Sequence, residues 1–271
     1  MSRILKLFMK IPISCYSCYK EQKDSPNEVI QIYYIYQYFK EDGLYHLECP
    51  LGHKTKIPFL GHRFEFLYEL GLYAILDGYF REAVASFTSS LERFYEFYIN
   101  FIVFKDKIPE SDFDKTWKII ANQSERQLGA FIFAYLKENS SSPELLSNSN
   151  IEFRNNVIHK GKFPNKEEAL KYGKAVLDVI HPKYRYFTKN YGDLVKKHFW
   201  EQMNKYYPET PDGRLIIPTY LSVTSLEDTP RELDEHFKIH QKRITEARNF
   251  PEGRWMVLKT PPKDNYYERI S

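Results

Sequence analysis

The chain has 271 residues, a formal net charge of +3, 42% hydrophobic residues and 28% charged residues. This balance excludes a disordered chain and is typical of a folded globular protein with one large domain or two small ones. A net charge this small also excludes nucleic-acid binding through a protein-wide positive field. Nucleic acid would therefore have to meet a local basic patch.

The sequence contains no uninterrupted apolar segment of the roughly 18 residues that a membrane helix requires. Arg3, Lys6 and Lys10 interrupt the N-terminal segment, which leaves no space for the apolar region of a signal peptide. We therefore expect a cytoplasmic protein with no membrane partner. In that compartment the three cysteines are expected to be free thiols or metal ligands and not disulfides.

Residues 1–60 are predicted to form a small antiparallel β module. Residues 29–39 are rich in Ile, Tyr and Val, and residues 44–49 are a second β-prone run. Between the two runs lies Lys40-Glu-Asp-Gly43, which is a hairpin turn signal. We therefore expect the two runs to pair as a hairpin.

The β module also carries a candidate zinc site, made of Cys15-x2-Cys18 and Cys49-Pro-Leu-Gly-His53. Two knuckles of this kind place four ligands around one point, as tetrahedral zinc requires, and four protein ligands indicate a structural site. His46 is an alternative fourth ligand, and three unrelated buried thiols are the alternative to a metal site. The segment resembles zinc ribbons, whose second knuckle often has the sequence Cys-Pro-x-Gly-His, although no glycine follows Cys18 in the first knuckle.

Residues 61–206 are predicted to form a helical domain, because apolar residues recur there at three- and four-residue spacing. The first helical stretch covers residues 62–104 and is expected to bend at Gly78. The second covers residues 111–136, with Ser111 as its N-cap.

Two strong boundary signals follow along the chain. A helix over residues 151–159 is expected to end where Gly161 adopts a left-handed conformation. Asn165 and Glu168 then form a capping box for a helix that reaches about residue 180, where His181-Pro182 is expected to stop it. A further helix is predicted over residues 191–206.

Residues 207–271 are predicted to form a small α+β C-terminal extension, or an arm docked on the helices. Residues 215–223 and 255–259 have β-like composition, and residues 231–248 have a helical pattern. The sequence of this extension does not indicate its role.

The segment Phe153-Arg-Asn-Asn-Val-Ile-His-Lys-Gly161 contains the residue types that metal-independent RNA cleavage needs. Cleavage requires a base for the 2′-hydroxyl proton, an acid for the leaving 5′-oxygen and positive charge for the transition state. Histidine has a suitable pKa for both proton transfers, and arginine grips two phosphate oxygens at once. Arg154 and His159 are therefore candidate catalytic residues, with Asn155 as a neighbouring donor and acceptor.

Spacing alone does not single out this pair, because Arg231 and His236 are also five positions apart. Acidic residues separate that second pair and would repel a phosphate, whereas no acid lies between Arg154 and His159. Positions five apart on a helix diverge by about 140°, so we expect the helix end to turn His159 back toward Arg154. The alternative has Arg154 paired with a surface acid and His159 as a polar helix C-cap.

Arg154-Asn-Asn-Val-Ile-His159, followed by Lys-Gly and a capped helix, resembles the signature of the HEPN superfamily (higher eukaryotes and prokaryotes nucleotide-binding). The resemblance covers roughly residues 64–186. Residues 81–95 are similar to the long helix that precedes the motif in that family, where an acidic or polar residue often faces the catalytic pair. This implies Glu92 as a further active-site residue, with Ser89 as the weaker candidate and a plain surface charge as the alternative for Glu92.

The resemblance implies a mainly α fold, in which a HEPN-like helical bundle follows the small β zinc ribbon and precedes the α+β extension. It also implies a homodimer whose two motif segments face each other and form one composite active site. Many members of the family are metal-independent endoribonucleases that act as toxins or antiviral effectors. Others have lost catalysis and serve as binding modules.

The leading hypothesis is therefore a homodimeric endoribonuclease that cleaves RNA by 2′-hydroxyl attack. Its expected role is that of a toxin-like or antiviral (anti-phage) defence effector, with a protein partner or antitoxin. The second is a non-catalytic HEPN and zinc-ribbon scaffold that binds RNA, nucleotide or protein. The third is a structural component of a larger assembly, with residues 207–271 as its docking arm. A Gly-rich phosphate loop and a His-Glu-x-x-His motif are both missing, which disfavours nucleotide hydrolysis and metalloprotease chemistry.

Overall fold

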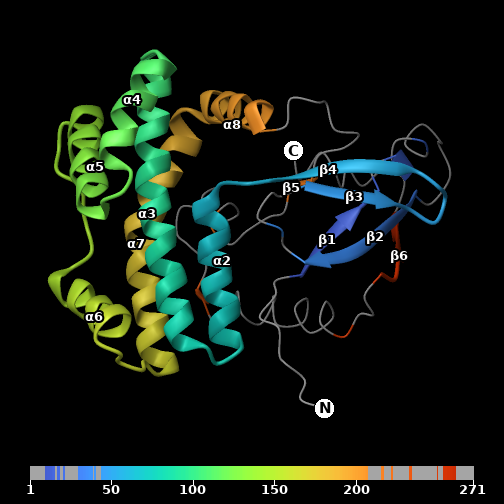
Figure 1. Cartoon of the computed structure of the whole chain (residues 1–271), viewed down its shortest axis with the longest axis horizontal. Helices are drawn as coiled ribbons and strands as arrows, with labels where there is room; N and C mark the ends of the chain where they lie inside the picture. The colour runs from blue at the N-terminus through green and yellow to red at the C-terminus, as the bar shows by residue number, and fades with distance from the viewer. Residues whose placement is uncertain are drawn as a thin grey trace. The chain divides into compact units, whose positions relative to one another are not determined.

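The computed structural model of the chain (Figure 1) describes residues 10–15, 17–18, 21, 30–38, 40, 44–206, 215–216, 221, 232–233, 249 and 253–260. Two compact units divide the chain: unit 1 comprises residues 1–61, 203–218 and 235–271, and unit 2 comprises residues 62–202 and 219–234. The described residues are mainly helical, with a few small strands that begin near the N-terminus. The expected fold class is confirmed at this level, and the predicted domain boundaries stay a prediction.

Unit 1 contains a three-stranded antiparallel sheet in the order β1-β2-β6. Its strands are β1 (Lys10–Ser14), β2 (Ile30–Tyr38) and β6 (Met256–Thr260). Lys10 is opposite Tyr38 on one side of β2, and Ile30 is opposite Thr260 on the other. The strand β6 of the C-terminal extension thus completes a sheet that β1 begins.

A second sheet of unit 1 has the order β3-β4-β5, with β3 (Leu44–Glu48) antiparallel to β4 (Lys54–Leu60). The short strand β5 (Leu215–Ile216) is parallel to β4. The predicted hairpin between residues 29–39 and 44–49 is therefore wrong, although both runs are strands. β2 has β1 and β6 on its two sides, and β3 pairs with β4 through the tight turn at Gly52, whose φ is +83°.

Unit 2 is built around the long helix α3 (Phe80–Lys105), which contacts α2, α5, α6 and α7 (Figure 1). Its buried positions recur at the predicted helical spacing and include Ala83, Phe87, Leu91, Phe94, Tyr95 and Tyr98. The other helices are α2 (Arg63–Leu76), α4 (Glu110–Ile120), α5 (Ser124–Asn139), α6 (Asn148–His159), α7 (Lys166–Asn190) and α8 (Gly192–Tyr206). No helix among the described residues is long and apolar enough to cross a membrane.

The ring of Phe87 on α3 determines how closely α2 and α7 can pack against α3. A Cβ atom on Gly71 of α2 would lie 2.5 Å from Cε1 of Phe87, and one on Gly173 of α7 would lie 2.7 Å from its Cε2. Both distances are too short for non-bonded carbon atoms, so only glycine allows α2 and α7 to pack this closely against α3. The Tyr68 hydroxyl adds a hydrogen bond to the Gly173 carbonyl at 3.0 Å.

Two helix boundaries differ from the sequence prediction. The single helix expected over residues 111–136 is in fact two helices, α4 and α5. In the break between them, the buried side chain of Gln127 donates a hydrogen bond to the Ala121 carbonyl at 2.5 Å. The stop expected at Pro182 is also wrong, because α7 continues to Asn190. Proline removes one backbone donor, while Lys183 Nζ donates to the Val179 carbonyl at 2.8 Å and buried residues on both sides hold the helix in place.

Candidate functional site

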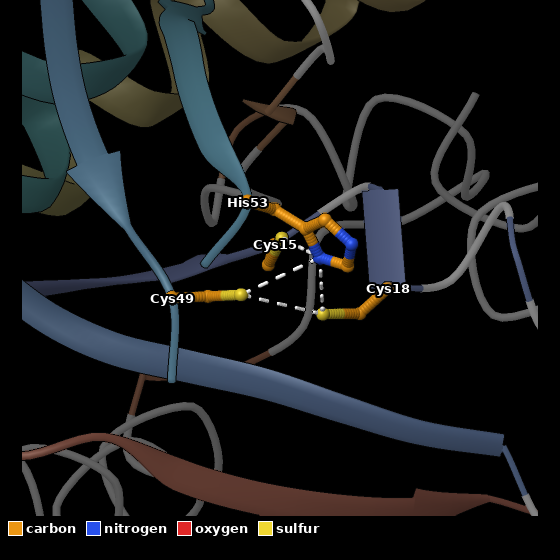
Figure 2. Close-up of side chains that lie close together, drawn as sticks. All are labelled: Cys15, Cys18, Cys49 and His53. Carbon is orange, nitrogen blue, oxygen red and sulfur yellow. Dashed lines mark hydrogen bonds between the residues drawn. The ribbon is translucent and has the colours of Figure 1, made fainter. Parts of the chain in front are cut away.

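The four predicted metal ligands lie together in unit 1 (Figure 2). Cys15 follows β1, Cys18 lies in a short helical turn, and Cys49 and His53 flank the turn between β3 and β4. Cys18 Sγ is 3.7 Å from Cys49 Sγ, and His53 Nδ1 lies 3.3 to 3.8 Å from the three sulfur atoms. All four ligand atoms are within 4.8 Å of one another.

The separation of the Cys18 and Cys49 sulfur atoms and the three sulfur–nitrogen distances match the edges of a metal-centred tetrahedron. With metal–sulfur bonds of about 2.3 Å and a metal–nitrogen bond of about 2.0 Å, adjacent sulfur atoms are separated by about 3.8 Å and a sulfur and nitrogen by about 3.5 Å. The cluster is thus already close to the size that a tetrahedral ion requires. His46, the alternative fourth ligand, is exposed on β3 and does not belong to the cluster.

The backbone of the second knuckle favours an anionic sulfur at Cys49. Burial raises the pKa of the Cys15 and Cys18 thiols. Burial acts in the same direction on Cys49, but hydrogen bonds from the backbone amides of His53 and Leu51 to its sulfur lower its pKa overall. Amides directed at a sulfur stabilise a thiolate, which is the form that binds a metal.

Sequence reasoning missed a residue that orients His53. Glu21 Oε1 lies 2.9 Å from His53 Nε2, on the side of the ring away from the sulfur atoms. A carboxylate in this position keeps the proton on Nε2 and leaves Nδ1 free to coordinate. Tyr33 and Trp255 pack against the three buried cysteines, so the C-terminal extension helps to cover the cluster. The arrangement can hold a metal ion with four protein ligands.

The predicted catalytic segment forms α6 in unit 2. Ser147 caps its start by accepting a hydrogen bond from the Asn150 amide at 3.3 Å. Beyond its end, Gly161 has a φ of +74°, which confirms the predicted left-handed stop. Asn165 and Glu168 form the predicted capping box at the start of α7, with both hydrogen bonds at 2.9 Å.

Arg154 is half-buried beside α3 and α7. Its Nη1 donates to Asn155 Oδ1 at 2.9 Å, which joins two of the predicted site residues. It also lies next to Tyr172 of α7, whose hydroxyl is 2.9 Å from Thr88 Oγ1 of α3.

Both Arg154 and the predicted acidic residue Glu92 influence the pKa of Tyr172. Burial raises the pKa of Tyr172, the Thr88 hydrogen bond and Arg154 oppose this shift, and the charge of Glu92 adds to it. Arg154 of α6 therefore lies at the Tyr172 hydroxyl, and Glu92 of α3 acts on it through its charge alone. The side chain of Ser89, the weaker candidate, makes no hydrogen bond with the described residues.

His159 is not joined to Arg154 within one chain. It is the last residue of α6 and is exposed, and no hydrogen bond links it to Arg154 among the described residues. Because His159 is still helical, the two side chains leave the helix about 140° apart, and the expected turn back toward Arg154 does not occur. The second Arg-x4-His pair, Arg231 and His236, lies outside the described residues.

Comparisons of the chain with family models, with curated proteins and with solved structures give no significant match. The resemblance to the HEPN superfamily therefore stays a prediction from the sequence.

Proposed function

We propose that the chain is a metal-independent endoribonuclease that acts on RNA through Arg154, Asn155 and His159. The observation that carries the proposal is the placement of Arg154. Its guanidinium donates to Asn155 and lies beside Tyr172, and His159 is exposed on the same short helix. This supplies a fixed cation for a phosphate and an accessible imidazole for proton transfer.

In the proposed reaction a ribose 2′-hydroxyl attacks the adjacent phosphorus. The proton of the hydroxyl passes to a base, the bond from phosphorus to the 5′-oxygen breaks, and that oxygen receives a proton. His159 serves as the base or the acid, Arg154 and Asn155 hold the phosphate oxygens, and Glu92 positions the arginine. The products are a 2′,3′-cyclic phosphate and a free 5′-hydroxyl.

The proposed enzyme is a homodimer with a composite site. Because Arg154 and His159 of one chain leave α6 in different directions, a second copy has to supply the missing partner. The proposed setting is the cytoplasm, where the enzyme is a toxin-like or antiviral effector that cuts cellular RNA and is controlled by a protein partner.

The test is incubation of total RNA with wild type, Arg154→Ala and His159→Ala protein, followed by mapping of the RNA ends. We expect 2′,3′-cyclic phosphate ends from wild type only, and growth arrest on induction of wild type only. His46→Ala is the matched control, because His46 is also an exposed histidine but lies on β3. Full cleavage by both active-site variants, with circular dichroism unchanged, would refute the proposed site.

A non-catalytic RNA-binding or protein-binding scaffold is the second candidate. It is favoured by one observation, the lack of a hydrogen bond between Arg154 and His159 among the described residues. The scaffold predicts RNA binding that survives His159→Ala and no cleavage by wild type. The same end-mapping experiment therefore separates the two candidates.

We further propose that Cys15, Cys18, Cys49 and His53 hold one structural zinc ion. The tetrahedral edge lengths, the buried sulfur atoms and the Glu21 contact to His53 support this assignment. Elemental analysis should find one zinc per chain, and X-ray absorption should find three sulfur neighbours and one nitrogen neighbour. Unchanged zinc content in Cys49→Ser, compared with wild type, would contradict it.

A further inference from the structure

The loop after α6 is held rigidly although it is exposed. Gly161 turns the chain out of the helix, and the Lys162 amide donates to the Asn156 carbonyl at 3.0 Å. Lys162 Nζ is 2.6 Å from Glu168 Oε1 and lies 4.9 Å from the centre of the Phe153 ring. Pro164 is buried.

Phe163 is the residue that this loop presents to solvent. It is 86% exposed, more than any other large hydrophobic residue among those the structure describes. Both of its neighbours are fixed, Lys162 by Glu168 and Pro164 by burial, so the ring is displayed by an anchored loop. An aromatic side chain displayed in this way has a free face for stacking.

The loop is also connected to the proposed catalytic residues. The Phe153 ring under Lys162 packs on Tyr172 with a centroid distance of 5.7 Å, and Tyr172 lies beside Arg154. Phe163 is four residues beyond His159, which limits their Cα separation to about 14 Å. A nucleotide next to a phosphate held at the site is within reach of the ring.

The charges around Phe163 favour a polyanion. Lys160 and Lys166 flank Phe163 and are exposed, whereas Lys162 is paired with Glu168 and the exposed Glu167 directly follows Lys166. Cores of protein interfaces are poor in lysine. By contrast, sites for single-stranded nucleic acid combine lysines that follow the backbone with aromatic rings that stack on bases.

We propose that Phe163 is a base-stacking residue that positions single-stranded RNA, with Lys160 and Lys166 contacting the adjacent phosphates. The inference rests on the proposed ribonuclease function and assigns it a recognition element. It also predicts that the substrate is unpaired at this position, because a base inside a duplex has no free face for stacking.

The experiment measures binding of a fluorescein-labelled single-stranded RNA to full-length protein in a His159→Ala background, which prevents cleavage during titration. Adding Phe163→Ala should weaken binding roughly 5- to 150-fold, which is the range for loss of one stacked base. Phe163→Trp should bind like the parent and Phe163→Leu like the alanine variant, because leucine keeps the apolar volume without an aromatic face. Phe133→Ala is the matched control, since Phe133 of α5 is 73% exposed.

An RNA with one abasic position gives the sharper result. With the abasic site at the stacked position, the RNA should bind the parent protein and the Phe163→Ala variant with equal affinity. With the abasic site at any other position, the parent protein should still bind more tightly than the Phe163→Ala variant. Equal loss in Phe163→Ala and Phe133→Ala, or a changed oligomeric state without changed RNA binding, would overturn the proposal. If wild type binds RNA through Phe163 but leaves no cyclic phosphate ends, the recognition role stands and only the proposed chemistry fails.

Discussion

Glu65→Gln tests the energetics of the core of unit 2. Glu65 is 4% exposed, and its carboxyl group accepts hydrogen bonds from the Tyr184 hydroxyl at 2.5 Å and from the His62 amide at 3.3 Å. Burial raises the pKa of Glu65 from 4.5 to about 7, although both hydrogen bonds oppose the shift. Near neutral pH the Glu65 carboxyl group is therefore still partly protonated in the folded protein, whereas it is ionised in the unfolded chain.

The sign and size of the effect follow from this shift. Because the folded pKa is higher than the unfolded one, the stabilising contribution is complete below pH 4.5 and is lost as the pH rises to about 7. A difference of about 2.5 units corresponds to about 3 kcal/mol. Glutamine does not titrate but loses one hydrogen bond, at a cost of about 1 kcal/mol. We expect Glu65→Gln to be about 2 kcal/mol more stable than wild type at pH 8 and about 1 kcal/mol less stable at pH 4.

The assay is urea unfolding of both proteins across this pH range, followed by tryptophan fluorescence. The difference between the two proteins is the quantity to follow, because the half-buried His62 and the buried His198, whose pKa values burial lowers to about 3 and 4, are present in both proteins. A difference in unfolding free energy that stays constant from pH 4 to pH 8 would show that Glu65 is ionised normally in the folded state, and the reasoning would fail.

Three further predictions use other features of the structure. Gly173→Ala should lower the unfolding free energy measured in urea by about 1–2 kcal/mol, because the overlap of the new methyl group with Phe87 exceeds the gain in helix propensity. Gly129→Ala is the control and should raise the unfolding free energy, because the space around Gly129 is open. Asn165→Ala should cost about 1 kcal/mol, measured as a lower Tm, by removing the cap of α7. Removal of the proposed zinc with a chelator should increase proteolysis of unit 1, and Cys49→Ser should have the same effect without chelator.

Local features of the fold could be predicted from the sequence, because they depend on a few neighbouring residues. The left-handed stop at Gly161, the capping box at Asn165 and the helical spacing of the α3 core are of this kind. The pairing of β2 with β6 was not predictable in this way, because the two strands are separated by most of the chain and no turn residue links them. Pro182 misled the prediction, since burial along α7 outweighs the loss of one backbone hydrogen bond.

The candidate sites show the same limit. Cysteine and histidine spacing identified the Cys3His cluster, because ligand type and knuckle sequence are local signals. Glu21 and Trp255, which contact the cluster, carry no such signal. Tyr172 lies on a different helix from Arg154, and its contact with Arg154 and Thr88 depends on how α3, α6 and α7 pack.

The separation of Arg154 from His159 leads to the most direct test of a composite site. A general base must lie within about 3.2 Å of the oxygen whose proton it takes, and the two side chains of one chain leave α6 about 140° apart. In a two-fold dimer, Arg154 of one copy can meet His159 of the other. A mixed dimer of Arg154→Ala and His159→Ala chains then has one site with both residues and one site with neither.

Mixing the two inactive variants after partial denaturation and refolding should therefore restore RNA cleavage to about a quarter of the wild-type level, because half of the dimers are mixed and each has one active site of two. Each variant refolded alone is the control and should stay inactive. If Arg154 and His159 act within one chain, no mixed dimer contains an intact site and mixing restores nothing. That outcome, with dimers confirmed by light scattering, would exclude a site shared between chains while leaving ribonuclease activity itself in place.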